Sequence, residues 1–300
     1  MKVAVTGGTG FVGERLTRHL LATGAEVNLL TRSMRSGLPE RANAFVWDPQ
    51  AEEAPREALD GVDVVINLAG EPVAQRWSPE IKRRIRDSRV TTTQNLVAAM
   101  GRLEQPPGLL ISASAVGYYG SRGDEELDET SASGKDFLAE ISQEWEAAAV
   151  AAEAFGTRVL ILRFGIVLGQ EGGALQRMLP PFRIGLGGPL GSGQQWMSWI
   201  HIDDLIGMMM FAIQYPHIHG VWNGVAPNAA TNQDFTDALA RILKRPAFFR
   251  VPEFALKLLF AEGAKTLTAS QRVKPVAPEA AGFRYQYAGL HAALRQILRS

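Results

Sequence analysis

The sequence contains no cysteine, and this absence excludes several kinds of chemistry. Disulfide bonds, catalysis by a thiolate and zinc sites built on cysteine are ruled out. An excess of charge of one sign is also absent, because the 31 Lys and Arg residues equal the 31 Asp and Glu residues. A neutral chain lacks the broad positive field that nucleic-acid binding uses, so we expect no nucleic-acid partner.

Long hydrophobic runs are missing as well. The longest apolar run lies near Leu205–Ile213, which is far shorter than the ~20 residues that span a bilayer. The N-terminus, MKVAVTGGTG, lacks the apolar stretch and cleavage site of a signal peptide. The sequence therefore predicts a cytoplasmic protein without a membrane partner. His217 and His219 have no third ligand nearby, so we expect no metal site.

Short apolar segments alternate with helical patterns over roughly the first 165 residues. The expected strands are Val3–Val5, Val27–Leu30, Phe45–Trp47, Val62–Leu68, Leu109–Ile111 and Arg158–Leu162. Two long helices are expected between them, at Pro79–Met100 and at about Lys135–Phe155. Such alternation is typical of a parallel sheet with helices on both faces. The predicted fold class is therefore α/β, with a doubly wound Rossmann sheet.

The pattern changes after residue 165. Residues 165–193 are rich in glycine and proline, which excludes a single regular element. Loops that reach over a site and a mobile surface loop are equally consistent with this stretch. We predict a Rossmann domain at 1–165, completed by about 201–224, and a smaller C-terminal α/β lobe at 166–200 and 225–300. The substrate cleft is expected between them, since such clefts form at lobe interfaces.

The strongest signal is the glycine-rich loop TGGTGFVG at residues 6–13, with the spacing G-x-x-G-x-x-G. It follows a strand and opens a helix, which is the context that dinucleotide binding requires. Gly7 allows a tight turn, Gly10 lets the backbone approach a pyrophosphate, and Gly13 permits close packing of the helix. The N–H groups at the helix N-terminus then bind phosphate. The expected cofactor contacts here are Gly7, Thr9, Gly10, Phe11, Val12 and Gly13.

The end of the second strand distinguishes NAD(H) from NADP(H). An acidic residue there would bind the ribose 2′-hydroxyl and repel a 2′-phosphate, but the chain has Thr31-Arg32-Ser33. Arg32 is able to form charge-assisted hydrogen bonds to a 2′-phosphate, with Thr31, Ser33 and Arg35 beside it. The alternative is a solvated surface arginine. The sequence therefore favours NADP(H) over NAD(H).

Four motifs together resemble the extended short-chain dehydrogenase/reductases. They are TGGTGFVG at 6–13, NLAG at Asn67–Gly70, SASAVGYYG at Ser112–Gly120 and WIHIDDL at Trp199–Leu205. The resemblance covers nearly the whole chain and extends to an atypical, epimerase-like subfamily of unknown substrate, the YfcH-like proteins. It implies a set of further cofactor contacts at strand ends, namely Asn67, Leu68, Ala69, Gly70, Ser112, Ala113, Arg163, Gly165 and Val167.

The catalytic pair of that superfamily, Tyr-x-x-x-Lys on a helix, is absent. No tyrosine of this chain stands four residues before a lysine. The corresponding positions are predicted to be Leu138 and Ser142, and a leucine cannot donate a proton. Either another group performs the acid–base step or the protein performs none.

Several residues are candidates for the missing acid. The resemblance places Ser114 at the serine of the catalytic set, although a serine alone is a poor acid at neutral pH. Tyr118 and Tyr119 have the right functional group, but packing beneath a loop is at least as consistent with their position. Lys135 and Glu140 are further alternatives.

Two functions from different classes fit these observations. One is an NADP(H)-dependent oxidoreductase or epimerase-like enzyme that acts on a small polar substrate, as a monomer or homodimer. The other is a catalytically silent NADP(H)-binding sensor or regulatory protein. Asp203, in the WIHIDDL motif, is expected to cap the helix that follows it rather than to take part in catalysis.

Overall fold

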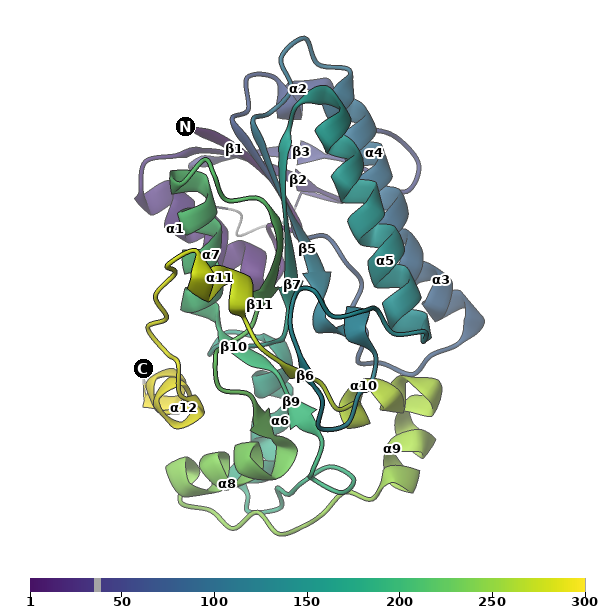
Figure 1. The fold of residues 1–300 in the computed structure, drawn as a ribbon, viewed down its shortest axis with the longest axis vertical. Helices are drawn as coiled ribbons and strands as arrows, with labels where there is room; N and C mark the ends of the chain where they lie inside the picture. The colour runs from purple at the N-terminus through teal and green to yellow at the C-terminus, as the bar shows by residue number, and fades with distance from the viewer. Residues whose placement is uncertain (35–38, 300) are drawn as a thin grey trace.

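The computed structural model describes residues 1–34 and 39–299, and a seven-stranded parallel sheet forms its centre (Figure 1). The sheet has the order β11-β7-β5-β4-β1-β2-β3. Its strands are β1 (Lys2–Thr6), β2 (Glu26–Thr31), β3 (Ala42–Val46), β4 (Val64–Asn67), β5 (Leu109–Ala115), β7 (Arg158–Phe164) and β11 (Gly220–Gly224). The predicted doubly wound α/β fold is confirmed. After β1 the chain adds β2 and β3 on one side of the sheet, and it then adds β4 and the later strands on the other side. Sheets of this kind bind ligands at the point where the strand order reverses, here between β1 and β4.

Helices cover both faces of this sheet because successive strand residues point to opposite sides. Val3 and Val5 belong to the core beneath α1 (Phe11–Ala22) and α7 (Ile202–Gln214). Ala4 belongs instead to the core on the other face. That face is covered by the helices α2 (Arg56–Leu59), α4 (Val90–Gly101) and α5 (Phe137–Val150), which is followed by the 3₁₀ helix η2 (Ala151–Phe155).

The long helix predicted at Pro79–Met100 is in fact two helices, so that prediction is wrong in one respect. The chain forms α3 (Pro79–Asp87), then breaks at Ser88 and Arg89 before α4 begins. The Ser88 hydroxyl accepts a hydrogen bond from the backbone N–H of Glu71 at 2.9 Å, and Arg89 donates to the Ile85 carbonyl. Contacts with a remote loop therefore stabilise a break that no proline or glycine marks in the sequence.

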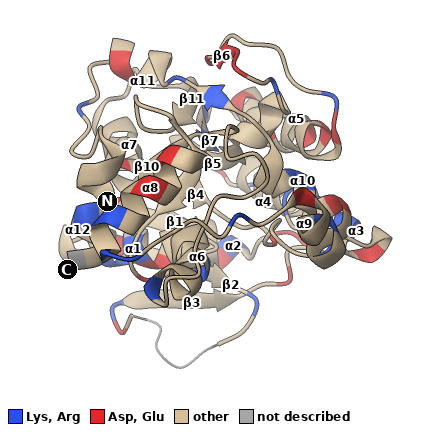
Figure 2. Cartoon of the chain, turned by 90° about the horizontal axis from the view of Figure 1, so that it is seen from below, with Lys and Arg blue, Asp and Glu red and all other residues tan. Residues whose placement is uncertain are grey.

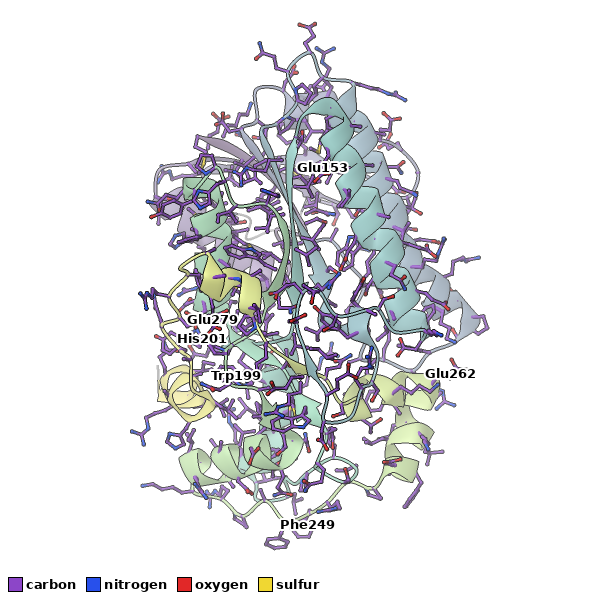
Figure 3. The ribbon with its side chains drawn as sticks, in the orientation of Figure 1. Glu153, Trp199, His201, Phe249, Glu262 and Glu279 are labelled. Atoms are coloured by element: carbon purple, nitrogen blue, oxygen red, sulfur yellow. The ribbon has the colours of Figure 1, made fainter. Side chains whose placement is uncertain are left out.

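The smaller lobe lies at the lower end of the molecule in Figure 1. Its helices are α6 (Gly173–Arg183), α8 (Asn232–Leu243), α9 (Glu253–Phe260), η3 (Ala261–Ala264), α10 (Lys265–Thr268) and α12 (Leu290–Arg299). Three two-stranded sheets accompany them: β8 (Ile166–Leu168) with β10 (Trp199–His201), β9 (Trp196–Met197) with β12 (Ala230–Thr231), and β6 (Glu126–Leu127) with β13 (Arg272–Val273). Trp199 and His201 lie where the two lobes meet (Figure 3).

One segment assigned to the smaller lobe lies elsewhere. The helix α11 (Val276–Ala280) packs against β11, and Phe283 belongs to the core of the larger lobe. The C-terminal region therefore returns to the larger lobe over about residues 276–285 before α12 rejoins the smaller one.

The cap of α7 also differs from the prediction. His201, rather than Asp203, is the capping residue, because its Nδ1 accepts a hydrogen bond from the Asp203 backbone N–H at 3.1 Å. The Asp203 carboxylate instead pairs with Arg15 at 2.7 Å, which ties α7 to α1.

No helix in the described part of the chain has the length and apolar character needed to cross a lipid bilayer. Figure 2 shows basic and acidic residues interspersed along the chain.

Candidate functional site

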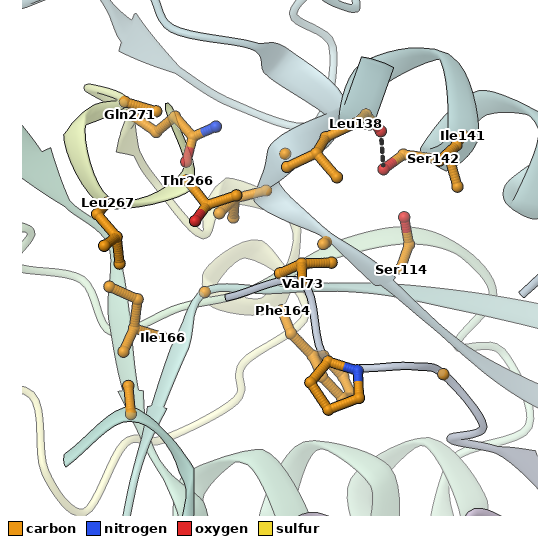
Figure 4. A pocket seen from close by; sticks show the side chains of 18 of the residues that line it. Val73, Ser114, Leu138, Ile141, Ser142, Phe164, Ile166, Thr266, Leu267 and Gln271 are labelled. Atoms are coloured by element: carbon orange, nitrogen blue, oxygen red, sulfur yellow. Dashed lines mark hydrogen bonds between the residues drawn. The ribbon is translucent and has the colours of Figure 1, made fainter. Parts of the chain in front are cut away.

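A cleft of about 1110 Å³ opens between the two lobes at the carboxyl ends of the sheet strands. The glycine loop, the ends of β4, β5 and β7, and the start of α5 line it from the larger lobe. Residues of α6, β9 and α10 line it from the smaller lobe. Figure 4 shows Thr266 and Leu267 on one side of this cleft, with Leu138, Ser142 and Ser114 on the other.

The glycine loop packs so tightly, both on the chain that follows β4 and on itself, that side chains are excluded at Gly7 and Gly13. Gly7 has φ +67°, and a Cβ there would lie 2.7 Å from the Leu68 backbone. A Cβ on Gly13 would lie 2.2 Å from the Gly7 carbonyl oxygen. Gly10 is different: it is exposed, and an added Cβ would meet only the Gly7 carbonyl, at 3.2 Å. The loop therefore presents bare backbone to the cleft at Gly10.

Five of the six loop residues expected to contact a cofactor line this cleft, namely Gly7, Gly10, Phe11, Val12 and Gly13. Thr9 lies exposed on the same loop, outside the lining. The ring of Phe11 packs closely over Gly169, Gly172 and Gly173, where Cβ atoms would come within 3 Å of it. Part of the glycine-rich stretch after residue 165 is thus explained by its contact with the loop.

Arg32 and Ser33 are exposed just beyond the end of β2. The pairing of Thr6 with Leu30 places them at the same edge of the sheet as the glycine loop. The Thr31 hydroxyl donates a hydrogen bond to the Ser33 carbonyl at 3.1 Å, which shapes this turn. Within the part of the chain that is described, Arg32 has no ion-pair partner. Arg35 lies outside the described residues.

Asn67 and Ser112, which the family resemblance places beside the cofactor, use their side chains to join strands. Both are fully buried. Asn67 accepts a hydrogen bond from the Thr6 hydroxyl at 2.7 Å and donates to Thr93 at 2.8 Å and to Ser112 at 3.3 Å. Their neighbours Leu68, Ala69, Gly70 and Ala113 line the cleft instead.

Ser114 lines the cleft and is joined to a buried ion pair. Its hydroxyl donates a hydrogen bond of 2.6 Å to Glu146, whose two carboxylate oxygens each accept one of 2.8 Å from Arg163. Burial disfavours the Arg163 charge, but the hydrogen bonds and charge of Glu146 outweigh it and raise the pKa of Arg163. Sequence analysis missed Glu146, because the only signal is an acidic residue on the inner face of a helix.

The two tyrosines proposed as acids lie away from the cleft lining. Tyr119 is fully buried, and its hydroxyl donates to Asn223 at 2.7 Å and accepts from Arg163 at 3.0 Å. Burial raises the pKa of Tyr119 to about 12, which makes proton release harder. The ring of Tyr118 stacks on the Arg163 guanidinium, with 3.4 Å between the ring centre and Cζ. These positions agree with packing and do not agree with an acid acting in the cleft.

Leu138 and Ser142, the positions predicted to correspond to the superfamily tyrosine and lysine, stand opposite Ser114 (Figure 4). The Ser142 hydroxyl donates to the Leu138 carbonyl at 2.8 Å. Both serine protons are therefore engaged inside the protein, and both oxygens offer only lone pairs to a ligand. Of the other candidates, Lys135 lines the edge of the cleft, whereas Glu140 is exposed outside it. Arg163 and Val167 also lie outside the lining, whereas Gly165 is part of it.

No group of three or more His, Cys, Asp or Glu side chains that could hold a metal ion is found among the described residues. The polar groups of the cleft are hydroxyls, amides and cations rather than a carboxylate cluster. The chemistry that this arrangement supports is the binding of a ligand with phosphates and flat, partly apolar rings.

Comparison with known proteins identifies two matching families. The model of the NAD dependent epimerase/dehydratase family matches residues 3–223, and that of a domain of unknown function, DUF1731, matches residues 251–297. An epimerase family protein SDR39U1 homolog of Arabidopsis thaliana, named as chloroplastic, is 44% identical over 100% of this chain and 87% of its own length. The epimerase family protein SDR39U1 of Homo sapiens is 40% identical over 99% of this chain and 100% of its own length.

Solved structures agree with these matches. A crystal structure of human SDR39U1 (isoform 2) with NADPH has a TM-score of 0.89 and 38% identity, and each chain is covered completely. A UDP-glucuronic acid 4-epimerase from Bacillus cereus, solved with UDP-glucuronic acid and NAD, has a TM-score of 0.81. That enzyme is 19% identical over 100% of this chain and 98% of its own, so it shows a shared fold alone.

Proposed function

Because the chain belongs to the NAD dependent epimerase/dehydratase family, we propose that it is an NADP(H)-binding protein of the atypical short-chain dehydrogenase/reductase type. The family membership predicted from the four motifs is confirmed by these matches. The cofactor itself is supported by the relative solved with NADPH and by the exposed arginine at the end of β2.

The glycine loop is the single observation that carries this proposal. Its backbone is bare at Gly10, and it is held in place by contacts that leave no room for side chains at Gly7 and Gly13. Such a loop at a helix N-terminus is suited to a pyrophosphate. We assign Gly7, Thr9, Gly10, Phe11, Val12 and Gly13 to the phosphates, and Thr31, Arg32 and Ser33 to the adenosine ribose with its 2′-phosphate.

The nicotinamide half is assigned to the neighbouring strand ends. Leu68, Ala69, Gly70, Ala113 and Gly165 line this part of the cleft. Asn67, Ser112, Arg163 and Val167 lie outside the lining, and we assign them a supporting role behind these strand ends. When bound, NADP(H) supplies a donor or acceptor of hydride.

In the described part of the cleft Ser114 faces the ligand, but the superfamily tyrosine is missing and Lys135 stands only at the edge. Ser114 is able to accept a hydrogen bond from a ligand hydroxyl or amide, since its own proton is held by Glu146. Leu138 contributes only an apolar surface. An oxidoreductase or epimerase-like activity on a small polar substrate therefore requires an acid supplied by Lys135, by the substrate or by water.

The missing Tyr-x-x-x-Lys pair also favours a second function, a catalytically silent NADP(H)-binding sensor. A turnover screen separates the two functions: NADPH oxidation is followed at 340 nm, a wavelength set by the cofactor, with aldehydes, ketones and sugar nucleotides as substrates. Any turnover that Ser114→Ala reduces supports the enzyme. Tight NADPH binding without turnover for any substrate supports the sensor. Failure of NADPH to raise the thermal unfolding midpoint of the protein would reject both functions.

A further inference from the structure

The cleft contains a cation that no carboxylate neutralises. Arg89 lines the cleft at the break between α3 and α4. It donates hydrogen bonds to the Ile85 carbonyl at 3.0 Å and to the Glu71 carbonyl at 2.9 Å. Across the described residues no carboxylate lies within 4.0 Å of its guanidinium, because the Glu71 side chain pairs with Arg84 instead. The two carbonyls hold the guanidinium in place, and the Glu71 carboxylate acts on its charge only from beyond ion-pair distance.

The buried surroundings of Arg89 disfavour its charged form. Desolvation lowers the pKa of Arg89 to about 10, yet the group stays charged at neutral pH. Leu68, Ala113 and Ile141 supply apolar surface to this part of the cleft. A charge in such surroundings is normally paired, since an unpaired one is strongly destabilising.

The ring of Trp145, which carries an unsatisfied donor, lies beside the guanidinium. Trp145 lines the cleft and is only 5% exposed, and its indole Nε1 has no hydrogen-bond partner among the described residues. Buried polar groups almost always have a partner, so such an N–H requires an explanation. Arg89 Cζ lies 5.3 Å from the centre of the Trp145 ring. Gly70 leaves room for the guanidinium, because a Cβ at this position would lie 3.2 Å from Arg89 Cζ.

We propose that Arg89 and Trp145 form an anion-binding subsite in the cleft, which takes a phosphate or carboxylate oxygen. This inference rests on the proposed function, since the same cleft holds the cofactor. The subsite lies between the ends of β4 and β5, whereas the glycine loop follows β1. The oxygen belongs either to the phosphate on the nicotinamide side of the cofactor or to a second ligand, and the experiment distinguishes the two.

The remaining charges of the cleft agree with an anionic ligand. Lys82 pairs with Glu262, whereas Lys135 and Lys265 are exposed at the edge of the cleft. The acidic residues of the lining are Asp136, whose carboxylate caps α5, and Glu262. Four cations therefore face two carboxylates in a chain whose formal net charge is zero.

The test uses two variants and one matched control. Arg89→Gln removes the charge, and Trp145→Phe removes the N–H while keeping an aromatic ring in the core. Arg83→Gln makes the same charge change at an exposed position outside the cleft lining and should alter no binding constant. Calorimetric titrations use NADPH, then 2′,5′-ADP, which lacks the nicotinamide-side phosphate, and then inorganic phosphate added to the NADPH-loaded protein.

Loss of a charge-assisted hydrogen bond predicts an affinity weaker by about 10- to 100-fold in Arg89→Gln, with a smaller loss in Trp145→Phe. If NADPH binding weakens while 2′,5′-ADP binding does not, the cofactor supplies the oxygen. If only phosphate binding to the loaded protein weakens, a second ligand supplies it. If both folded variants bind NADPH and phosphate as the wild type does, the subsite is rejected. If the wild type fails to bind NADPH, the proposed function fails, and phosphate titration of the ligand-free chain still tests the subsite.

Discussion

Gly10 is the residue of the glycine loop at which an added side chain would meet the ligand rather than the protein. Its backbone has φ −86°, which any residue adopts, and a Cβ would contact only the Gly7 carbonyl. We therefore expect Gly10→Leu to fold normally and to lose NADPH binding, because the side chain fills the position of the pyrophosphate. Calorimetric titration with NADPH measures this loss.

A matched control exists for this variant. A Cβ on Gly289 would meet nothing within 4 Å, and Gly289 lies at the start of α12, outside the cleft lining. Gly289→Leu should therefore bind NADPH as the wild type does. Unchanged NADPH affinity in Gly10→Leu would remove the glycine loop from the binding site.

Arg32 is the residue that should select the cofactor. It is exposed and has no ion-pair partner among the described residues, so it is available to a 2′-phosphate. Arg32→Ala should weaken NADPH binding by ~1.5–3 kcal/mol, the scale of a hydrogen bond to a charged group. NADH binding should hardly change, because NADH lacks this phosphate. Equal losses for the two cofactors would show that Arg32 does not contact the phosphate.

Residue types alone were a poor guide to the acid. Tyr118 and Tyr119 follow the end of β5 in the sequence, which suggested that one of them would reach the cleft. The 3₁₀ helix η1 (Val116–Tyr119) instead turns both rings toward Arg163. Sequence spacing does not reveal this contact, because Arg163 of β7 lies 44 positions from Tyr119 along the chain.

Helix α5 is joined to the sheet by a polar contact as well as by apolar packing, because Glu146 contacts β5 through Ser114 and β7 through Arg163. Glu146 and Arg163 are buried, so neutralising one leaves the other charge uncompensated. Glu146→Gln should lower the free energy of unfolding by ~3–5 kcal/mol, as measured by urea denaturation.

The same helix supplies the control. Glu144 pairs with Arg86 at 2.6 Å, but its side chain is 42% exposed. Exposed ion pairs contribute ~0–1 kcal/mol, so Glu144→Gln should change the free energy of unfolding little. Similar losses of unfolding free energy in the two variants would mean that the buried Glu146–Arg163 pair stabilises the protein no more than an exposed pair does.

Helix α7 gives the protein a pH dependence through its cap. Burial lowers the pKa of His201, despite the hydrogen bond to Gln296 and the nearby charges of Asp203 and Asp204. The unfolded chain therefore binds a proton more readily than the folded chain does. The contribution of His201 is fully present above its unfolded pKa of about 6.5 and is lost as the pH falls below that value.

His201→Asn keeps a capping side chain but removes the titrating group. Thermal unfolding midpoints of the wild type and this variant, measured from pH 7.5 to pH 5, test the assignment. The wild-type midpoint should fall more steeply than that of the variant. Parallel curves would show that His201 does not carry the acid sensitivity.

The order of the elements was predictable, but several of their ends were not. Apolar runs predicted six of the seven strands of the central sheet, and the glycine loop predicted the start of the first helix, but β11 was not among the predicted strands. The break at Ser88–Arg89 escaped prediction because it depends on bonds to Glu71, 17 and 18 positions away. The cap of α7 was assigned to Asp203 on residue type, whereas the structure uses the preceding histidine.

In the molecule as a whole the sheet could be predicted from the sequence, but the side-chain contacts that line the cleft could not. Motifs identify the glycine loop, the strand ends and the missing catalytic pair, because these depend on neighbouring residues. The contacts of Ser114 with Glu146, and of Arg89 with Trp145, join residues 32 and 56 positions apart. Such pairs arise only when the sheet brings several strand ends together.

The central claim is that the cleft between the lobes binds NADP(H). Parallel calorimetric titrations of the wild-type protein with NADPH and with NADH test it most directly. We expect one site per chain and tighter binding of NADPH than of NADH, by about tenfold or more, the scale of a charge-assisted hydrogen bond. Absence of NADPH binding, or equal affinity for the two cofactors, would contradict the account.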